Sequence, residues 1–324
     1  MTDILVFVEH AEGQLKTSSR QVLTAARQRG DGEVVALLVG QGAAAAARGL
    51  GVWGVTRALV ADAPELSDYA TEPLTAALLA ALAHCGAPVV LHPADPHLTD
   101  AVARAAIRLQ AGVITDAVDL ELRNGRMVAT KEVLGGAMVS RCQVSGERIQ
   151  LIGIRSNAFP VEEVHAGPVV VEVLEVVMDD QARRARVVEV VRTRGGGRPE
   201  LSEAAVIVAG GRGLGDAESF RLLEELADEL GAAVGASRAA TDAGWYPHHA
   251  QIGQTGKTVS PQLYLGVGIS GAIQHRAGME TSQTIVAVNT DADAPLLTVA
   301  DLGVVGDLHR IIPQLLEVLR ARRG

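Results

Sequence analysis

The chain has 324 residues and a mass of 33.7 kDa, which predicts two domains at roughly 150 residues each, and its 48% hydrophobic and 21% charged residues exclude a disordered protein. The 29 Lys and Arg against 38 Asp and Glu give a formal charge of −9, and only three Phe, two Trp and three Tyr occur, so a nucleic-acid-binding protein is disfavoured. The two cysteines cannot build a disulfide framework or a zinc site alone, and they fit a reducing compartment.

A first strand is expected at the beginning of the chain. Residues 4–8 form an apolar run of five residues with no positively charged segment before it, which is typical of a β-strand and not of a signal peptide. No stretch approaches the roughly 18 uninterrupted apolar residues of a membrane-spanning helix. We therefore expect a cytoplasmic protein without membrane insertion.

The first hundred residues alternate short apolar runs with helical patterns. Strands are expected at 4–8, 34–39, 57–60 and 88–92, and helices at 17–29, 41–50, 69–84 and 97–110. Continuous apolar strands that alternate with helices predict a parallel sheet covered on both faces.

The pattern then changes to strands separated by turn residues. Strand-like runs occupy 119–123, 127–133, 137–144 and 148–154, and the turns between them are Asn124-Gly125, Gly135-Gly136 and Ser145-Gly146. Asn-Gly between two such runs is a strong hairpin signal, so an antiparallel meander of these four runs is expected beside the parallel sheet. Residues 169–177 and 186–191 add extended segments.

A triglycine at 195–197, flanked by charge and proline, marks the clearest boundary. It predicts an N-terminal α/β domain at 1–193, a linker at 194–200 that lets the domains swing, and a second, doubly wound α/β domain at 201–324. Within the second domain the strands are expected at 204–209, 232–234, 263–267 and 284–288, and the helices at 217–230, 271–277 and 307–322.

Two glycine-rich segments fail the motifs that they suggest at first. In 210–215 the G-x-G-x-x-G spacing places Asp216 where the third glycine should stand, which weakens an ordinary NAD-binding interpretation. Before Gly256-Lys257-Thr258, Gln251 stands where a Walker A loop needs glycine, which excludes an NTPase. The glycines of 210–215 still permit close approach of a phosphate, and a plain strand–helix turn explains them as well.

Three other segments carry groups that could bind a ligand. Residues 266–275 lead from a strand into a small-residue turn and a short helix, whose N–H groups could hold a pyrophosphate with help from Ser270. Arg238 stands in a small-residue loop open to a planar ligand, and 251–256 concentrates amide and hydroxyl groups. An ordinary helix cap, a solvated arginine and a polar surface loop remain the alternatives. No histidine or cysteine spacing favours a metal site, and no Gly-x-Ser-x-Gly motif favours a hydrolase.

Six ordered segments make the second domain similar to the α subunit of electron transfer flavoproteins. They are residues 210–214, 233–245, 251–261, 266–275, 285–289 and 299–308. The first domain resembles the family more loosely, through residues 5–10 and the order of sheet and meander.

The resemblance implies an electron carrier without substrate chemistry of its own. Such a chain forms a heterodimer with a β subunit, which completes the cofactor cleft and holds an AMP, while the α subunit supplies most contacts to FAD. The resemblance further implies that electrons arrive from acyl-CoA dehydrogenases of fatty acid β-oxidation and related flavoenzymes, and leave to a quinone oxidoreductase.

The resemblance also implies roles for single residues. Arg238 would lie against the isoalloxazine ring, and Thr255 would place its hydroxyl near N5. The remaining flavin contacts would come from Ile252, Gly253, Gln254, Ile273, Gln274 and His275. The adenosine and pyrophosphate would be held by Arg212, Ser237, Ser270, Gly271, Ala272, Asn289, Asp307 and Leu308.

Two other interpretations stay open. The chain could be a nicotinamide-binding domain of transhydrogenase type, which also uses a glycine-rich α/β unit. It could instead belong to a bifurcating flavoprotein with a second FAD in the β partner, because that second site would lie mainly on the other chain.

Overall fold

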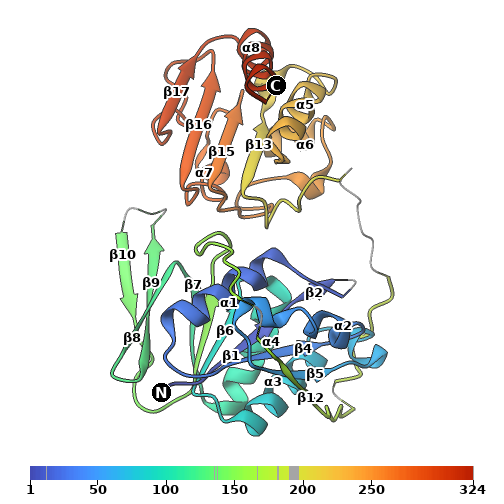
Figure 1. Cartoon of the computed structure of the whole chain (residues 1–324). Coiled ribbons are helices and arrows are strands. Elements are labelled where there is room, and N and C mark those ends of the chain that lie inside the picture. The colour runs from blue at the N-terminus through green and yellow to red at the C-terminus, as the bar shows by residue number, and fades with distance from the viewer. Residues whose placement is uncertain are drawn as a thin grey trace. The chain divides into compact units, whose positions relative to one another are not determined.

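The computed structural model describes residues 1–11, 13–134, 136, 138–165, 167–180, 182–189 and 197–323, without the side chain at 323 (Figure 1). The chain divides into two compact units, of which the first comprises Met1–Val133 and Met138–Val191 and the second Leu134–Ala137 and Arg192–Gly324. Residues 194–196 of the expected linker lie outside the described residues, so the domain limits and the swing stay predictions.

The first unit is built on a seven-stranded sheet in the order β12-β5-β4-β1-β6-β11-β7, with parallel pairing throughout. Its strands are β1 (Ile4–Val8), β4 (Val34–Val39), β5 (Arg57–Ala61), β6 (Val89–Pro93), β7 (Gly112–Ala117), β11 (Gln150–Ile154) and β12 (Val170–Val173). A two-stranded ladder of β2 (His10–Ala11) and β3 (Gln14–Leu15) follows β1. Every residue of β1, β6 and β11 is buried, as the continuous apolar runs predict.

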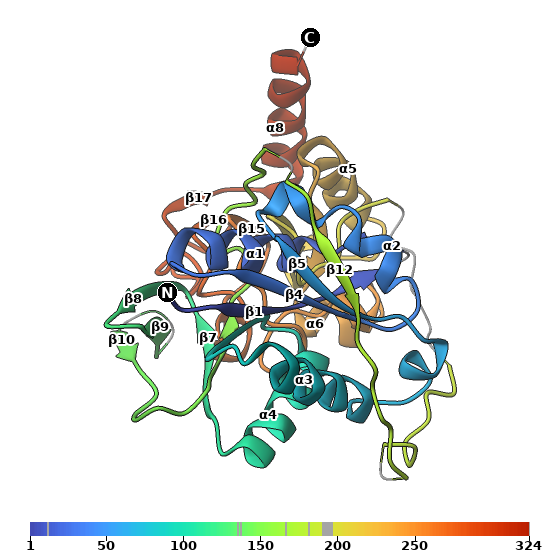
Figure 2. The same cartoon turned by 60° about the horizontal axis from the view of Figure 1, so that its bottom comes forward.

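Helices cover both faces of this sheet (Figure 2). One core joins the strands to α1 (Thr17–Arg29), α2 (Ala43–Ala47) and the 3₁₀-helix η1 (Leu50–Trp53). The other core joins them to α3 (Glu72–Cys85), α4 (Pro96–Leu109) and η2 (Pro64–Ser67). The helix expected at 41–50 is shorter, because Gly42 takes a φ of 90° before it and the chain then tightens into η1.

The meander has three strands and not four. β8 (Asp119–Arg123), β9 (Arg126–Val133) and β10 (Met138–Cys142) pair antiparallel in the order β10-β9-β8. The first turn is the expected hairpin, with φ of 51° at Asn124 and 72° at Gly125. The prediction for 148–154 is wrong in its pairing, because β11 lies parallel between β6 and β7. Its side chains are buried on both faces, which a meander edge would not allow.

The second unit contains a five-stranded parallel sheet in the order β14-β13-β15-β16-β17. Its strands are β13 (Val206–Gly210), β14 (Ala233–Ala236), β15 (Leu263–Val267), β16 (Thr284–Asn289) and β17 (Leu302–Val305). Its helices are α5 (Phe220–Leu230), α6 (Arg238–Asp242), α7 (Ile273–Arg276), α8 (Leu308–Arg323), and the 3₁₀-helices η3 (Arg212–Leu214) and η4 (His248–Ala250). The two-domain α/β fold is therefore confirmed.

The strand order of the second unit reverses between β13 and β15. The chain steps from β13 to β14 on one side, and then returns to β15 on the other side. In parallel sheets the loops at the carboxyl ends of the strands separate at such a reversal and leave room for a ligand. None of the helices within the described ranges is long and apolar enough to cross a membrane.

Candidate functional site

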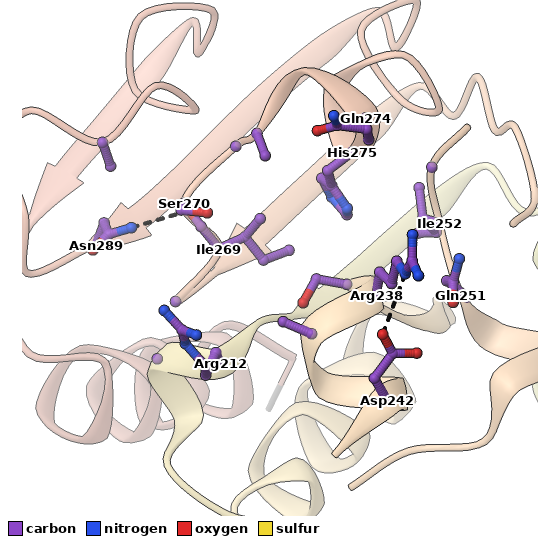
Figure 3. A pocket seen from close by; sticks show the side chains of 18 of the residues that line it. Arg212, Arg238, Asp242, Gln251, Ile252, Ile269, Ser270, Gln274, His275 and Asn289 are labelled. Atoms are coloured by element: carbon purple, nitrogen blue, oxygen red, sulfur yellow. Dashed lines mark hydrogen bonds and ion pairs between the residues drawn. The ribbon is translucent and has the colours of Figure 1, made fainter. Parts of the chain in front are cut away.

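A cavity of about 650 Å³ lies at the carboxyl edge of the second sheet (Figure 3). The loops that follow β13, β14, β15 and β16 all contribute to its lining. Its volume falls within the roughly 300–1,000 Å³ of ordinary small-molecule and cofactor sites.

Glycines let the loops after β13 and β15 touch backbone to backbone. A Cβ atom on Gly211 would lie 2.2 Å from the carbonyl oxygen of Gly268, and one on Gly213 would lie 2.7 Å from the Gly268 Cα. The amide of Gly213 donates to the Gly268 carbonyl at 2.9 Å. The glycines of residues 210–215 thus permit this close approach, and the cavity opens beside it.

Backbone packing and a side-chain hydrogen bond fix the segment after β15, which contains no long helix. Gly271 has a φ of 82°, and a Cβ atom there would lie 2.3 Å from the backbone nitrogen of Leu296. The Asn289 side chain donates to the carbonyl of Ile269 at 3.0 Å. The helix expected at 271–277 has only the four residues of α7, and its N-cap is Ala272, so the suggestion that Ser270 caps it is wrong. Ser270 instead lines the cavity.

Two arginines bring positive charge to the cavity from different elements. Arg212 begins η3, and Arg238 begins α6 (Figure 3). Arg238 Nε lies 3.2 Å from Asp242 Oδ2, one turn further along α6, and the two side chains are 66% and 54% exposed. The charge of Arg238 is therefore partly offset and well solvated, which the sequence alone did not indicate.

Buried polar side chains form the wall between α6 and the loop 251–255. Thr241 donates its hydroxyl to Gln251 Oε1 at 3.0 Å, and Gln251 Nε2 donates to Thr255 Oγ1 at 2.9 Å. Thr241 and Gln251 are both buried, whereas Thr255 lies at the cavity surface. This chain of hydrogen bonds fixes the Thr255 side chain before any ligand binds.

His275 forms a second buried polar group at the cavity. Its Nε2 lies 2.7 Å from the Tyr264 hydroxyl, and its Nδ1 is buried without a hydrogen-bond partner among the described residues. Burial lowers the pKa of His275 to about 4, although the Ile252 backbone acts in the opposite direction. The imidazole is therefore neutral near pH 7.

The cavity unites most of the residues expected from the sequence. Of that set it is lined by Arg212, Ser237, Arg238, Ile252, Gly253, Gln254, Thr255, Ser270, Gly271, Ala272, Gln274, His275 and Asn289.

Three expected residues do not line this cavity. Ile273 is 72% exposed, and Leu308 is buried in the core beneath α8. Asp307 accepts a hydrogen bond from the His309 amide at 2.9 Å, at the beginning of α8. Ile273 is the first residue of the short helix α7, and Asp307 and Leu308 stand where α8 begins.

Several lining residues were not named individually as site residues. Gly213, Gln251, Gly268 and Ile269 lie in segments that the sequence marked as ligand-binding candidates, whereas Ala239, Asp242, Asp291 and Ala294 were missed. Gly213 and Gly268 stand inside glycine-rich segments, and the i,i+4 spacing of Asp242 from Arg238 could have indicated an ion pair. Nothing in the sequence pattern indicated Asp291 or Ala294.

The lining suits a large anionic ligand with a polar ring system. Two guanidinium groups, backbone amides between packed glycines, and side-chain amides and hydroxyls converge on one cavity. Across the described ranges no group of three or more His, Cys, Asp or Glu side chains could hold a metal ion.

Known proteins of one family match this chain over its whole length. The family model described as "Electron transfer flavoprotein domain" matches residues 4–189, and the model described as "Electron transfer flavoprotein FAD-binding domain" matches residues 200–280. The chain is 44% identical to the electron transfer flavoprotein subunit alpha of Mycobacterium leprae and 46% identical to that of Mycobacterium tuberculosis, with 100% of both chains covered in each case. It is 37% identical to protein FixB of Clostridium saccharobutylicum, over 97% of this chain and 95% of that protein.

Proposed function

Because the chain belongs to the family of electron transfer flavoprotein α subunits, we propose that it pairs with a β subunit and carries electrons between other flavoenzymes and a quinone oxidoreductase. The family is one of electron carriers, and its FAD-binding domain identifies FAD as the cofactor. Acyl-CoA dehydrogenases of fatty acid β-oxidation are the proposed donors, and an AMP is proposed for the β subunit. A cytoplasmic location stays a prediction.

The observation that carries this proposal is the cavity at the carboxyl edge of the second sheet. Its residues fit FAD on three counts. Glycine backbones leave open space at the reversal of strand order, two guanidinium groups line the cavity for an anionic ligand, and the buried Nδ1 of His275 has no partner of ordinary hydrogen-bond geometry within the described residues.

FAD supplies reversible electron acceptance at its ring system, and this chain's residues supply its surroundings. Arg212 and Ser270, together with the backbone of Gly271 and Ala272, would hold the pyrophosphate. Arg238 would place a positive charge near the ring and favour the reduced cofactor, with Asp242 moderating that charge. The hydrogen bond from Gln251 would hold the Thr255 hydroxyl in place for a contact with the ring. These residues position the cofactor and tune its potential, and none needs to break a substrate bond.

A titration tests the pairing with a β subunit. A cavity that is open to solvent should hold FAD weakly, and a partner that covers the cofactor should raise the affinity. FAD is titrated into the isolated chain and into the chain mixed with the β subunit of the same source, with flavin fluorescence as the readout. A large gain with the β subunit is expected, and equal affinity in both titrations would refute the heterodimer.

Two alternatives are separated by further measurements on the same preparation. A transhydrogenase-type domain would bind a nicotinamide, which gives no visible colour, whereas a bound flavin is yellow and bleaches on reduction. A bifurcating complex would contain two FAD per heterodimer, whereas the carrier proposed above would contain one FAD and one AMP.

A further inference from the structure

Tyr264 does not line the cavity itself, and its hydroxyl contacts the lining residue His275. It is the second residue of β15, its side chain is fully buried, and the core cluster to which it belongs is apolar. Its hydroxyl lies 2.7 Å from His275 Nε2, and the two rings are tilted by 58°. His275 itself is 7% exposed and points from α7 toward the side of the cavity that carries Ile252 (Figure 3).

The direction of this hydrogen bond follows from its surroundings. Burial raises the pKa of Tyr264 well above its ordinary value, so the hydroxyl keeps its proton. The described part of the chain gives that proton no acceptor other than His275 Nε2. If Nε2 carried a proton and donated instead, the phenol hydrogen would stay unsatisfied in an apolar core, which is unfavourable. Tyr264 therefore donates and Nε2 accepts.

The direction of this hydrogen bond also determines whether the second ring nitrogen, Nδ1, carries a proton. A neutral imidazole carries one proton, so an accepting Nε2 places that proton on Nδ1. Nδ1 is buried and makes no hydrogen bond of ordinary geometry to the described residues. Burial lowers the pKa of His275, while the Ile252 backbone acts on the ring as a weak acceptor and raises that pKa against the effect of burial. The free polar group of His275 is therefore a neutral donor, and it adds no third positive charge beside Arg212 and Arg238.

We propose that Tyr264 is a positioning residue of the FAD site, which holds His275 as the neutral Nδ1–H tautomer and so presents a hydrogen-bond donor without a full charge. The inference rests on the proposed function only in naming the cofactor. A neutral donor stabilises negative charge that gathers on a reduced ring less strongly than an imidazolium would. Tyr264 thus limits how far this wall of the cavity raises the potential of FAD.

The test uses the full chain without FAD, labelled with ¹⁵N in its histidine rings. Ring ¹⁵N chemical shifts distinguish a protonated from an unprotonated nitrogen, and His275→Asn identifies the signals of His275 among the nine histidines. One net hydrogen bond favours a tautomer by about fivefold, so the parent should show at least that excess of Nδ1–H. Tyr264→Phe keeps the ring and removes the donor, and it should lower the ratio of Nδ1–H to Nε2–H by about fivefold relative to the parent.

Tyr246→Phe is the matched control, because it also removes a tyrosine hydroxyl from the second unit. The hydroxyl of Tyr246 donates to Glu224 at 3.2 Å, and Tyr246 does not line the cavity. This variant should leave the signals of His275 unchanged. A parent with its proton on Nε2, or a Tyr264→Phe spectrum that matches the parent, would overturn the inference. The parent spectrum alone decides the tautomer if Tyr264→Phe does not fold. Failure of the chain to bind FAD would count against the proposed function and would leave this result standing.

Discussion

If Arg238 lies beside the ring of FAD, its ion pair with Asp242 predicts that the reduction potential of the cofactor shifts in opposite directions when either partner is removed. Arg238→Ala removes the positive charge and leaves Asp242 unpaired, so the negative charge of reduced FAD becomes less favourable and the potential falls. Asp242→Asn removes the negative partner, so the potential rises. If the pair had a purely structural role, the two substitutions would not shift the reduction potential in opposite directions.

The exposed fractions of the two side chains set the size of the shift. A unit charge about 5 Å from another contributes about 3 kcal/mol at an effective dielectric constant of 20, and about 0.8 kcal/mol in water. Because Arg238 is 66% exposed and paired, the value near the water limit applies. We expect shifts of about 0.5–1 kcal/mol, which is roughly 20–45 mV for one electron.

The assay is a spectroelectrochemical titration of four heterodimers, which carry the parent chain, Arg238→Ala, Asp242→Asn and Arg221→Ala. Arg221 is the control, because it is an arginine of the same unit that is 77% exposed on α5 and does not line the cavity. Equal potentials in all four proteins, or shifts of the same sign for Arg238→Ala and Asp242→Asn, would refute the placement of Arg238 beside the ring.

Two predictions concern packing and pH. Gly213→Ala should lower both the FAD content and the melting temperature, because its Cβ would lie 2.7 Å from backbone at Gly268, whereas Gly167→Ala meets open space and should change neither. Burial acts to raise the pKa of Glu72, but hydrogen bonds from Arg108 and Arg104 outweigh it and lower that pKa. The stabilisation is therefore present above about pH 4.5 and lost as the pH falls. Glu72→Gln should cost about 0.5–1 kcal/mol in urea unfolding at pH 7 and less at pH 4, and an equal cost at both would contradict this.

Local sequence patterns predicted the limits of helices and strands well where the pattern fitted only a helix or only a strand. The runs at 4–8, 34–39 and 263–267 and the helix at 17–29 have the expected limits. The strand at 148–154 was assigned to the wrong sheet, because pairing depends on partners far along the chain and not on the run itself. β7 and β17 were missed, because β7 mixes polar and apolar residues and β17 is an apolar run of only four residues.

The cavity was predictable to the extent that its residues stand in recognisable segments. Glycines, Ser237, Arg238 and the loop at 251–255 were found in this way. The partnership of Arg238 with Asp242, and that of His275 with Tyr264, depend on geometry that the pattern does not contain. The same limit explains why Asp307 and Leu308 were wrongly expected at the cavity. Asp307 faces the start of α8, and Leu308 faces the core.

The cavity draws all its lining from residues 212–294, and so from the second unit alone. Binding therefore adds free energy to the folding of that unit, by about 2.7 kcal/mol when free FAD is at a hundredfold its dissociation constant. The first unit gains nothing directly from the same ligand. In a cell that is short of flavin, the second unit would therefore lose this contribution to its stability, whereas the first unit would lose none directly.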